Sequence, residues 1–269
     1  MKDFELAQTD EPVIRLVTQG IVNGPDGRKM SKRWGNVVAP ATIVEKYGAD
    51  TVRMYVLFAG PPEQDFDWSD EQMAGQARFL KRVWALAATH QDATASAKHE
   101  GPFEGKALEI RRAAHKAVKR VGEAIERLSF NTAIAFIMEL VNALYDAGRP
   151  ETPAEKASMG EAIRTVTRLL APFAPHLADA IAEAYGAETF IVALGWPTYE
   201  PALVVDEILP YAVQVNGKLR GEIRIAADAG ESEVRAAAES EEKVRAALAG
   251  KALRKVVFVP KRLINFVVG

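Results

Sequence analysis

Helix signals fill almost the whole stretch from about residue 69 to residue 199. Ser69 with Gln72 three residues later makes a capping box that starts the first helix. Apolar side chains then recur at helical spacing, which predicts a buried face made by Met73, Ala77, Leu80, Val83, Trp84 and Ala87. Helical periodicity over such a length limits the central part of the chain to an all-helical arrangement.

Further helices are expected after this one. The second spans about residues 104–128, and the third follows Ser129 with an apolar stripe of Phe130, Ala133, Ile134, Ile137, Val141 and Leu144. Thr152 caps the fourth helix, which opens with Pro153, and the short fifth helix ends at Gly186. Helices joined by short connections predict an antiparallel bundle.

The hydrophobic period changes from helical to alternating after about residue 201. Two alternating runs flank Asn216-Gly217, a dipeptide typical of a two-residue β-hairpin. Two further strands, at residues 256–259 and 263–268, follow one helix with an inner face of Val234, Ala237, Ala238, Val244, Ala247 and Leu248. The order ββαββ predicts a small α+β domain.

The first 60 residues predict two short helices, from about residue 41 to 47 and from about residue 50 to 58. The second has Val52, Tyr55, Val56 and Ala59 on one face, and it is ended by a Gly-Pro-Pro run from Gly60. The chain therefore divides into three expected parts, residues 1–60, 61–200 and 201–269.

Composition excludes several classes of site. The 269 residues include no cysteine, which excludes disulfides and thiolate zinc sites, and the four histidines lack metal-ligand spacing, so no metal site is expected. No apolar run reaches membrane-spanning length and the start lacks a signal-peptide core, so a cytoplasmic protein without membrane contact is expected. The formal net charge of −2 leaves nucleic-acid binding to local clusters of cations.

The loop Lys29-Met30-Ser31-Lys32 carries the most specific chemistry. Turn dipeptides flank it, Asn23-Gly24 and Asp26-Gly27 before it and Gly35-Asn36 after it, so the lysines are expected on a hinged loop. Four such residues alone are also typical of an ordinary solvated surface loop. The residues that follow decide whether the loop has a chemical role.

The loop and the residues after it resemble class I aminoacyl-tRNA synthetases of the branched-aliphatic subgroup. Residues 29–32 are similar to the second signature of the class, and the resemblance continues through Gly35-Asn36-Val37-Val38 and residues 43–53. Tracts at residues 78–84, 130–140, 171–176, 213–218 and 259–260 are similar to bacterial-type leucyl-tRNA synthetases. Arg33 departs from the signature, which usually has a serine there.

The resemblance implies a C-terminal portion of such an enzyme. Residues 1–60 would be the KMSKS loop and stem-contact segment of the catalytic domain, 61–200 a helical anticodon-binding-type bundle, and 201–269 a C-terminal α+β tRNA-binding domain. The first signature, the amino-acid pocket and the editing domain are missing, so the chain is expected to be inactive alone. The full-length enzyme would be a monomer that activates leucine with ATP and Mg²⁺ and transfers it to tRNA(Leu). The alternative is a free-standing, non-catalytic tRNA-binding module.

The resemblance also assigns roles to the loop. When the leucine carboxylate attacks the α-phosphorus of ATP, negative charge grows on the departing pyrophosphate, and nearby ammonium groups stabilise that transition state. Lysine suits this task because it is a compact charge on a flexible stem. Lys29 and Lys32 are therefore the expected catalytic residues, and the expected ATP contacts are Lys29, Met30, Ser31 and Lys32.

Clustered cations are the candidate RNA contacts, because cations close together attract phosphates. They are Lys81, Arg82, Arg112, Lys116, Lys218, Arg220, Lys255, Lys261 and Arg262. Two alternatives stay open: a solvated helix face paired with Glu109, Glu123 and Glu126 in the bundle, and a basic strand edge that prevents pairing with other chains in the last domain.

Overall fold

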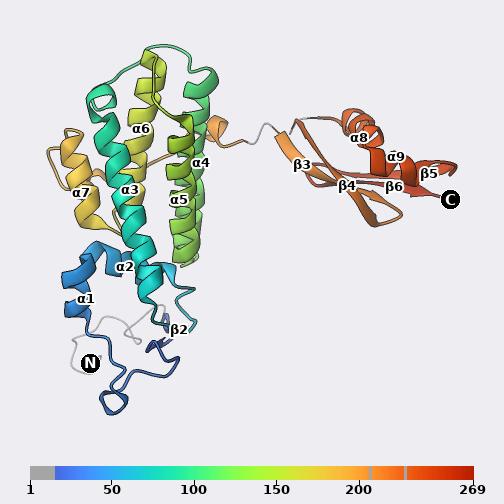
Figure 1. Cartoon of the computed structure of the whole chain (residues 1–269). Coiled ribbons are helices and arrows are strands. Elements are labelled where there is room, and N and C mark those ends of the chain that lie inside the picture. The colour runs from blue at the N-terminus through green and yellow to red at the C-terminus, as the bar shows by residue number, and fades with distance from the viewer. Residues whose placement is uncertain (1–15, 206–207, 227–228) are drawn as a thin grey trace, which may run out of the picture. The chain divides into compact units, whose positions relative to one another are not determined.

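The computed structural model describes residues 16–205, 208–226 and 229–269, so the first fifteen residues of the expected segment 1–60 lie outside it. The chain separates into two compact units, one that ends at Val204 and one that begins at Val205 (Figure 1). The three-part division expected from the sequence stays a prediction.

Four long helices run side by side in the described part of the first unit (Figure 1). They are α3 (Asp70–Thr94), α4 (Gly105–Glu126), α5 (Phe130–Ala147) and α6 (Pro153–Leu170), and the shorter α7 (Pro175–Ala184) packs against α3 and α6. Two expected caps are confirmed, because the Ser69 hydroxyl accepts the Gln72 N–H and the Thr152 hydroxyl accepts the Glu155 N–H. The mainly helical class is also confirmed.

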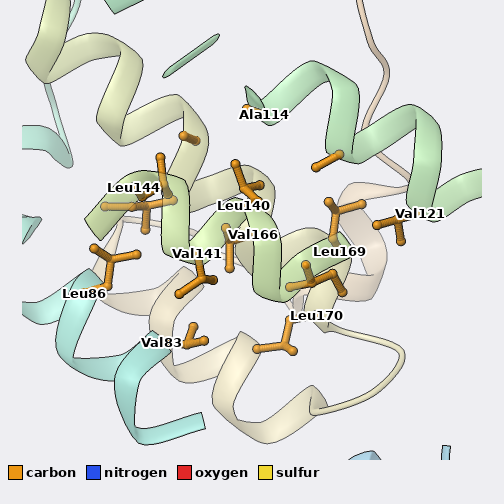
Figure 2. Close-up of a cluster of buried hydrophobic side chains, with 14 of the residues drawn as sticks. Val83, Leu86, Ala114, Val121, Leu140, Val141, Leu144, Val166, Leu169 and Leu170 are labelled. Carbon is orange, nitrogen blue, oxygen red and sulfur yellow. The ribbon is translucent and has the colours of Figure 1, made fainter. Parts of the chain in front are cut away.

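Apolar side chains from these four helices point toward one another in the core that Figure 2 shows. The expected α5 stripe is confirmed by Ile134 and Ile137, which are fully buried. The prediction that Trp84 of α3 is buried is wrong, because its side chain is 46% exposed. Val83 and Leu86 take the core-facing positions instead, and Trp84 lies about 100° around the helix from Val83.

Two short helices, α1 (Pro40–Tyr47) and α2 (Ala49–Phe58), form at one end of the bundle (Figure 1). Of the residues expected on one face of α2, Tyr55 is fully buried, whereas Val56 is 39% exposed. Polar contacts help to fix the orientation of α2. The Asp50 carboxylate accepts the Leu177 N–H at the start of α7 (2.8 Å), and the Tyr55 hydroxyl accepts the Ser69 N–H (2.7 Å).

A polar cluster ties α4 to α6 and to the end of the first unit. Arg111 donates to Glu161 (2.8 Å) and to Glu200 (2.8 Å). His115 Nδ1 accepts the Glu200 backbone N–H (3.0 Å), so its Nε2 carries the hydrogen and donates to Glu161 (3.1 Å). Burial raises the pKa of Glu161, but the hydrogen bonds from His115 and Arg111 and the charge of Arg111 outweigh it and lower the pKa from 4.5 to about 2.

A lowered carboxyl pKa makes stability depend on pH. The Glu161 contribution is fully present above pH 4.5 and is lost as the pH falls toward about 2. Glu161→Gln should therefore cost about 1–2 kcal/mol of unfolding free energy at pH 7, a value reduced for solvent screening because the side chain is 34% exposed. The difference from wild type should shrink in urea unfolding at pH 3.

The matched control is Glu123→Gln, which removes an exposed carboxylate that pairs with Arg127 just after the end of the same helix. Its effect should stay within about 0.5 kcal/mol at both pH values. If both variants lost the same unfolding free energy, the Glu161 cluster would contribute no more to stability than an exposed ion pair.

The second unit contains a four-stranded sheet in the order β4-β3-β6-β5. The strands are β3 (Ile208–Val215), β4 (Lys218–Ala226), β5 (Leu253–Val259) and β6 (Leu263–Val268). The expected hairpin joins β3 to β4, and both turn residues, Asn216 (φ 50°) and Gly217 (φ 76°), take the positive φ that this dipeptide tolerates. β6 pairs in parallel with β3.

The helical part of this unit differs from the prediction. Two helices, α8 (Glu231–Ser240) and α9 (Glu242–Leu248), replace the one expected, so the order is ββααββ. Glu241 between them is extended (ψ 127°). In an unbroken helix Val244 would lie about 80° around the axis from Val234, and the break lets both side chains enter the core.

Candidate functional site

Residues 29–32, here called the lysine loop, extend from a small hairpin in the first unit. β1 (Val22–Asn23) pairs in parallel with β2 (Phe66–Asp67), and Asn23 then bridges antiparallel to Lys29. The Gly24 N–H donates to the Arg28 carbonyl (2.8 Å), which closes the turn between the two arms. The lysine loop therefore begins on paired backbone.

A single turn of 3₁₀ helix, η2 (Lys32–Trp34), forms the far side of the loop. The Ser31 hydroxyl caps it by accepting the Arg33 N–H (3.2 Å), and Gly35 ends it with φ 63°. Ser31 is half-buried, as is Met30. The Ser31 hydroxyl thus has a local structural partner in addition to the ATP contact expected of it.

Asn36 joins the two sides of the loop. Its side-chain oxygen accepts the Ser31 N–H (2.9 Å), and its amide nitrogen donates to Asp26 (3.0 Å) and to the Arg28 carbonyl (3.3 Å). The hydrogen bond from Asn36, together with bonds from Arg28, lowers the pKa of Asp26 from 3.8 to about 2 despite the opposing effect of desolvation. Asp26 is therefore a carboxylate near neutral pH.

The two lysines of the loop are exposed to solvent. Neither Lys29 nor Lys32 makes an ion pair with another residue that the structure describes. The neighbouring arginines are engaged locally: Arg28 pairs with Asp26 (2.7 Å), and the guanidinium carbons of Arg28 and Arg33 lie 5.1 and 5.5 Å from the centre of the Trp34 ring. Arg33, which stands where the signature usually has serine, therefore packs on an aromatic ring.

The candidate RNA contacts of the first unit differ in their surroundings. Lys81 is exposed, whereas Arg82 donates to Asn142 (2.9 Å) and lies over the Tyr145 ring. On α4, Arg112 and Lys116 are half-buried and already interact with other groups of the chain. RNA contact by these four residues stays a prediction.

The candidate RNA contacts of the second unit are all exposed but do not lie together. The register places Lys218, Arg220 and Lys255 toward the end of the sheet where β3 turns into β4. Lys261 and Arg262 lie in the turn between β5 and β6, at the opposite end, where the Lys261 N–H donates to the Tyr211 hydroxyl (2.6 Å). The five cations therefore form two groups.

Two family models match parts of the chain. Residues 4–69 match the model described as tRNA synthetases class I (I, L, M and V), and residues 107–235 match the anticodon-binding domain of tRNA ligase. Over the whole chain, a leucine–tRNA ligase of Geobacter sp. (strain M21) and one of Citrifermentans bemidjiense are each 46% identical, and one of Herpetosiphon aurantiacus is 39% identical. The chain belongs to the leucyl-tRNA synthetase family. It spans about a third of the length of these relatives (33%, 33% and 32%) and corresponds to their C-terminal part.

A solved structure supports the same assignment. The leucyl-tRNA synthetase of Agrobacterium radiobacter K84, in a ternary complex with tRNA and LeuAMS, aligns with 99% of this chain and 35% of its own at a TM-score of 0.86 and 34% identity. A methionyl-tRNA synthetase of Mycobacterium tuberculosis aligns with 66% of this chain at a TM-score of 0.55 and 22% identity, which shows a shared fold alone.

Sequence reasoning missed the connection between Asp26 and Asn36. Both belong to dipeptides that were interpreted only as turn formers, although a short polar side chain on each side of a loop is also the signal for a cross-loop hydrogen bond. Within the described residues, no group of three or more His, Asp or Glu side chains could hold a metal ion, and the expectation of no metal site stays a prediction. None of the helices described is both long and apolar enough to cross a bilayer.

Proposed function

We propose that the chain is the part of a leucine–tRNA ligase that supplies the lysine loop and tRNA-binding surfaces. The complete protein activates leucine with ATP, bound with Mg²⁺, and transfers the leucyl group to tRNA(Leu). This part alone neither binds ATP tightly nor forms leucyl adenylate. The complete protein is a cytoplasmic monomer.

One observation carries this proposal: the lysine loop presents two ammonium groups to solvent from a backbone held by hydrogen bonds. Lys29 and Lys32 have no ion pair with any described residue, whereas Arg28 and Arg33 have local partners. Unpaired ammonium groups are available to phosphate oxygens. The relatives at 46% identity are leucine–tRNA ligases, which makes the departing pyrophosphate the corresponding anion.

Pyrophosphate exchange separates the ligase from a free-standing tRNA-binding module. The isolated chain should show no leucine-dependent ATP–pyrophosphate exchange, and the protein encoded by the reading frame extended upstream of Met1 should show both exchange and leucylation. A complete protein that binds tRNA but catalyses neither reaction would favour the module. Exchange by the isolated chain would contradict the proposed division of parts.

The exposed cations of the second unit should make tRNA binding sensitive to salt. Each lost phosphate contact lowers the magnitude of the negative slope of log K against log salt by about 0.7–0.9, so Lys261→Ala with Arg262→Ala should reduce that magnitude by about 1.4–1.8. Arg235→Ala is the control, because Arg235 pairs with Glu239 on α8 (2.8 Å). Equal slopes for wild type and the double variant would remove these two residues from the RNA contacts.

A further inference from the structure

The Asn36 side chain contacts the backbone on both sides of Lys29. Its side-chain oxygen accepts the N–H of Ser31, which lies between them, and its amide nitrogen is 3.3 Å from the Arg28 carbonyl and 3.4 Å from the Lys29 carbonyl. One side chain thus holds the backbone at Lys29 and the residue that caps the turn containing Lys32.

The surroundings favour one orientation of the Asn36 amide. Asp26 accepts from the Asn36 amide (3.0 Å) and from the Arg28 N–H (3.2 Å), so the carboxylate fixes the orientation of the amide. Gly24 is buried against both side chains, and a Cβ there would lie 2.9 Å from the Asn36 nitrogen and 2.9 Å from an Asp26 oxygen. The three residues therefore form a close-packed clamp, here called the Asp26–Asn36 clamp.

We propose that Asn36, held by Asp26, is a positioning residue that fixes the backbone of the lysine loop so that Lys29 and Lys32 meet the departing pyrophosphate together. Lysine side chains have many rotamers, and each ammonium group can reach its partner reproducibly only from a fixed backbone. A displacement of about 1 Å can cost about 100-fold in rate, so loss of the clamp should act on the chemical step. The inference rests on the proposed function, because it assigns a role within that site.

The activity test compares Asn36→Ala with Asn23→Ala in the complete ligase. Asn36→Ala should lower kcat of leucine-dependent ATP–pyrophosphate exchange by about 10–100-fold with KM for leucine unchanged. Asn23 is the matched control, because it is a neighbouring asparagine whose amide donates to Asp67 and joins β1 to β2. A normal kcat for Asn36→Ala would overturn the inference.

Lys32→Ala, measured in parallel, distinguishes a failure of the clamp from a failure of the proposed role of the lysines. If Lys32→Ala lowers exchange and Asn36→Ala does not, only the clamp is wrong. If Lys32→Ala also leaves exchange unchanged, the proposed role of the loop is wrong.

A polarity swap tests the clamp itself. Asn36→Asp places two carboxylates where a 3.0 Å hydrogen bond now lies, so it should open the loop and lower kcat at least as much as Asn36→Ala. Adding Asp26→Asn restores a donor facing an acceptor and should recover part of the lost kcat. No recovery would mean that the Asp26–Asn36 bond is not what positions the loop.

Hydrogen exchange of the chain itself gives a readout that does not need catalysis. The Ser31 N–H is bonded to Asn36, so its exchange should accelerate at least 10-fold in Asn36→Ala and return toward the wild-type rate in the swapped double variant. This acceleration should be absent in Asn23→Ala. Unchanged exchange in Asn36→Ala would show that the clamp does not order the loop, and this result would leave the function proposal standing.

Discussion

Lys32→Ala in the complete ligase is expected to lower kcat of leucine-dependent ATP–pyrophosphate exchange by about 100–1,000-fold, and Lys29→Ala by a similar or smaller factor. The reason is that each ammonium group is exposed and unpaired among the described residues, so its charge is available to the pyrophosphate that departs in the transition state. The double variant should approach the background rate. The affinity for tRNA should change little, because the loss lies in the chemical step.

Two neighbouring substitutions control for general effects of charge and folding. Lys46→Ala removes an exposed lysine of α1 whose ammonium group lies over the Tyr47 ring (4.7 Å), and it should leave exchange nearly unchanged. Arg33→Ala removes a cation that packs on Trp34 and should have a much smaller effect than Lys32→Ala. Undiminished exchange in the double lysine variant would falsify the proposed role of the loop.

Gly160→Ala is expected to destabilise the first unit by about 2–3 kcal/mol. Gly160 lies inside α6 and is buried where the helix passes the end of α3, and a Cβ would overlap the Thr94 carbonyl oxygen. Backbone cannot move aside as a flexible side chain does, so the two helices must separate. Urea unfolding followed by the helical circular-dichroism signal measures the loss as a lower midpoint with an unchanged slope.

Gly75→Ala is the opposite case on a neighbouring helix. Gly75 lies in α3, and a Cβ there would approach only the flexible end of Arg78, at 3.8 Å. Alanine is a better helix former than glycine, so this variant should be more stable by about 0.5–1 kcal/mol. The same sign for both variants would contradict the packing of α6 on the end of α3.

Local signals predicted the elements well. The capping residues Ser69 and Thr152 accept the expected N–H groups, and Asn216-Gly217 forms the expected hairpin turn. These features depend on residues close together in the chain, so the sequence contains all the information they need. The lysine loop was recognised for the same reason, since its residues are consecutive.

Features that depend on neighbours from distant segments were predicted poorly. Trp84 and Val56 fit helical stripes, but the packing of other helices decided that they face outward. The helix of the second unit was expected to be continuous, and the break at Glu241 turns Val244 onto the sheet. Arg111 is held by Glu161 and Glu200, which are far away in sequence, and nothing in its own helix indicates these partners.

By itself the sequence determined the helical bundle, the strand pairs near the C-terminus and the loop with two lysines, because these depend on residue spacing and on short motifs. Only the tertiary structure decided which charged side chains stay available to bind a ligand. Arg28, Arg33 and Arg111 are engaged by Asp26, Trp34 and Glu161, while Lys29 and Lys32 stay exposed. The physical reason is that a charge is paired or left in solvent according to which side chains the fold brings within a few ångströms, and spacing along the chain does not report that distance.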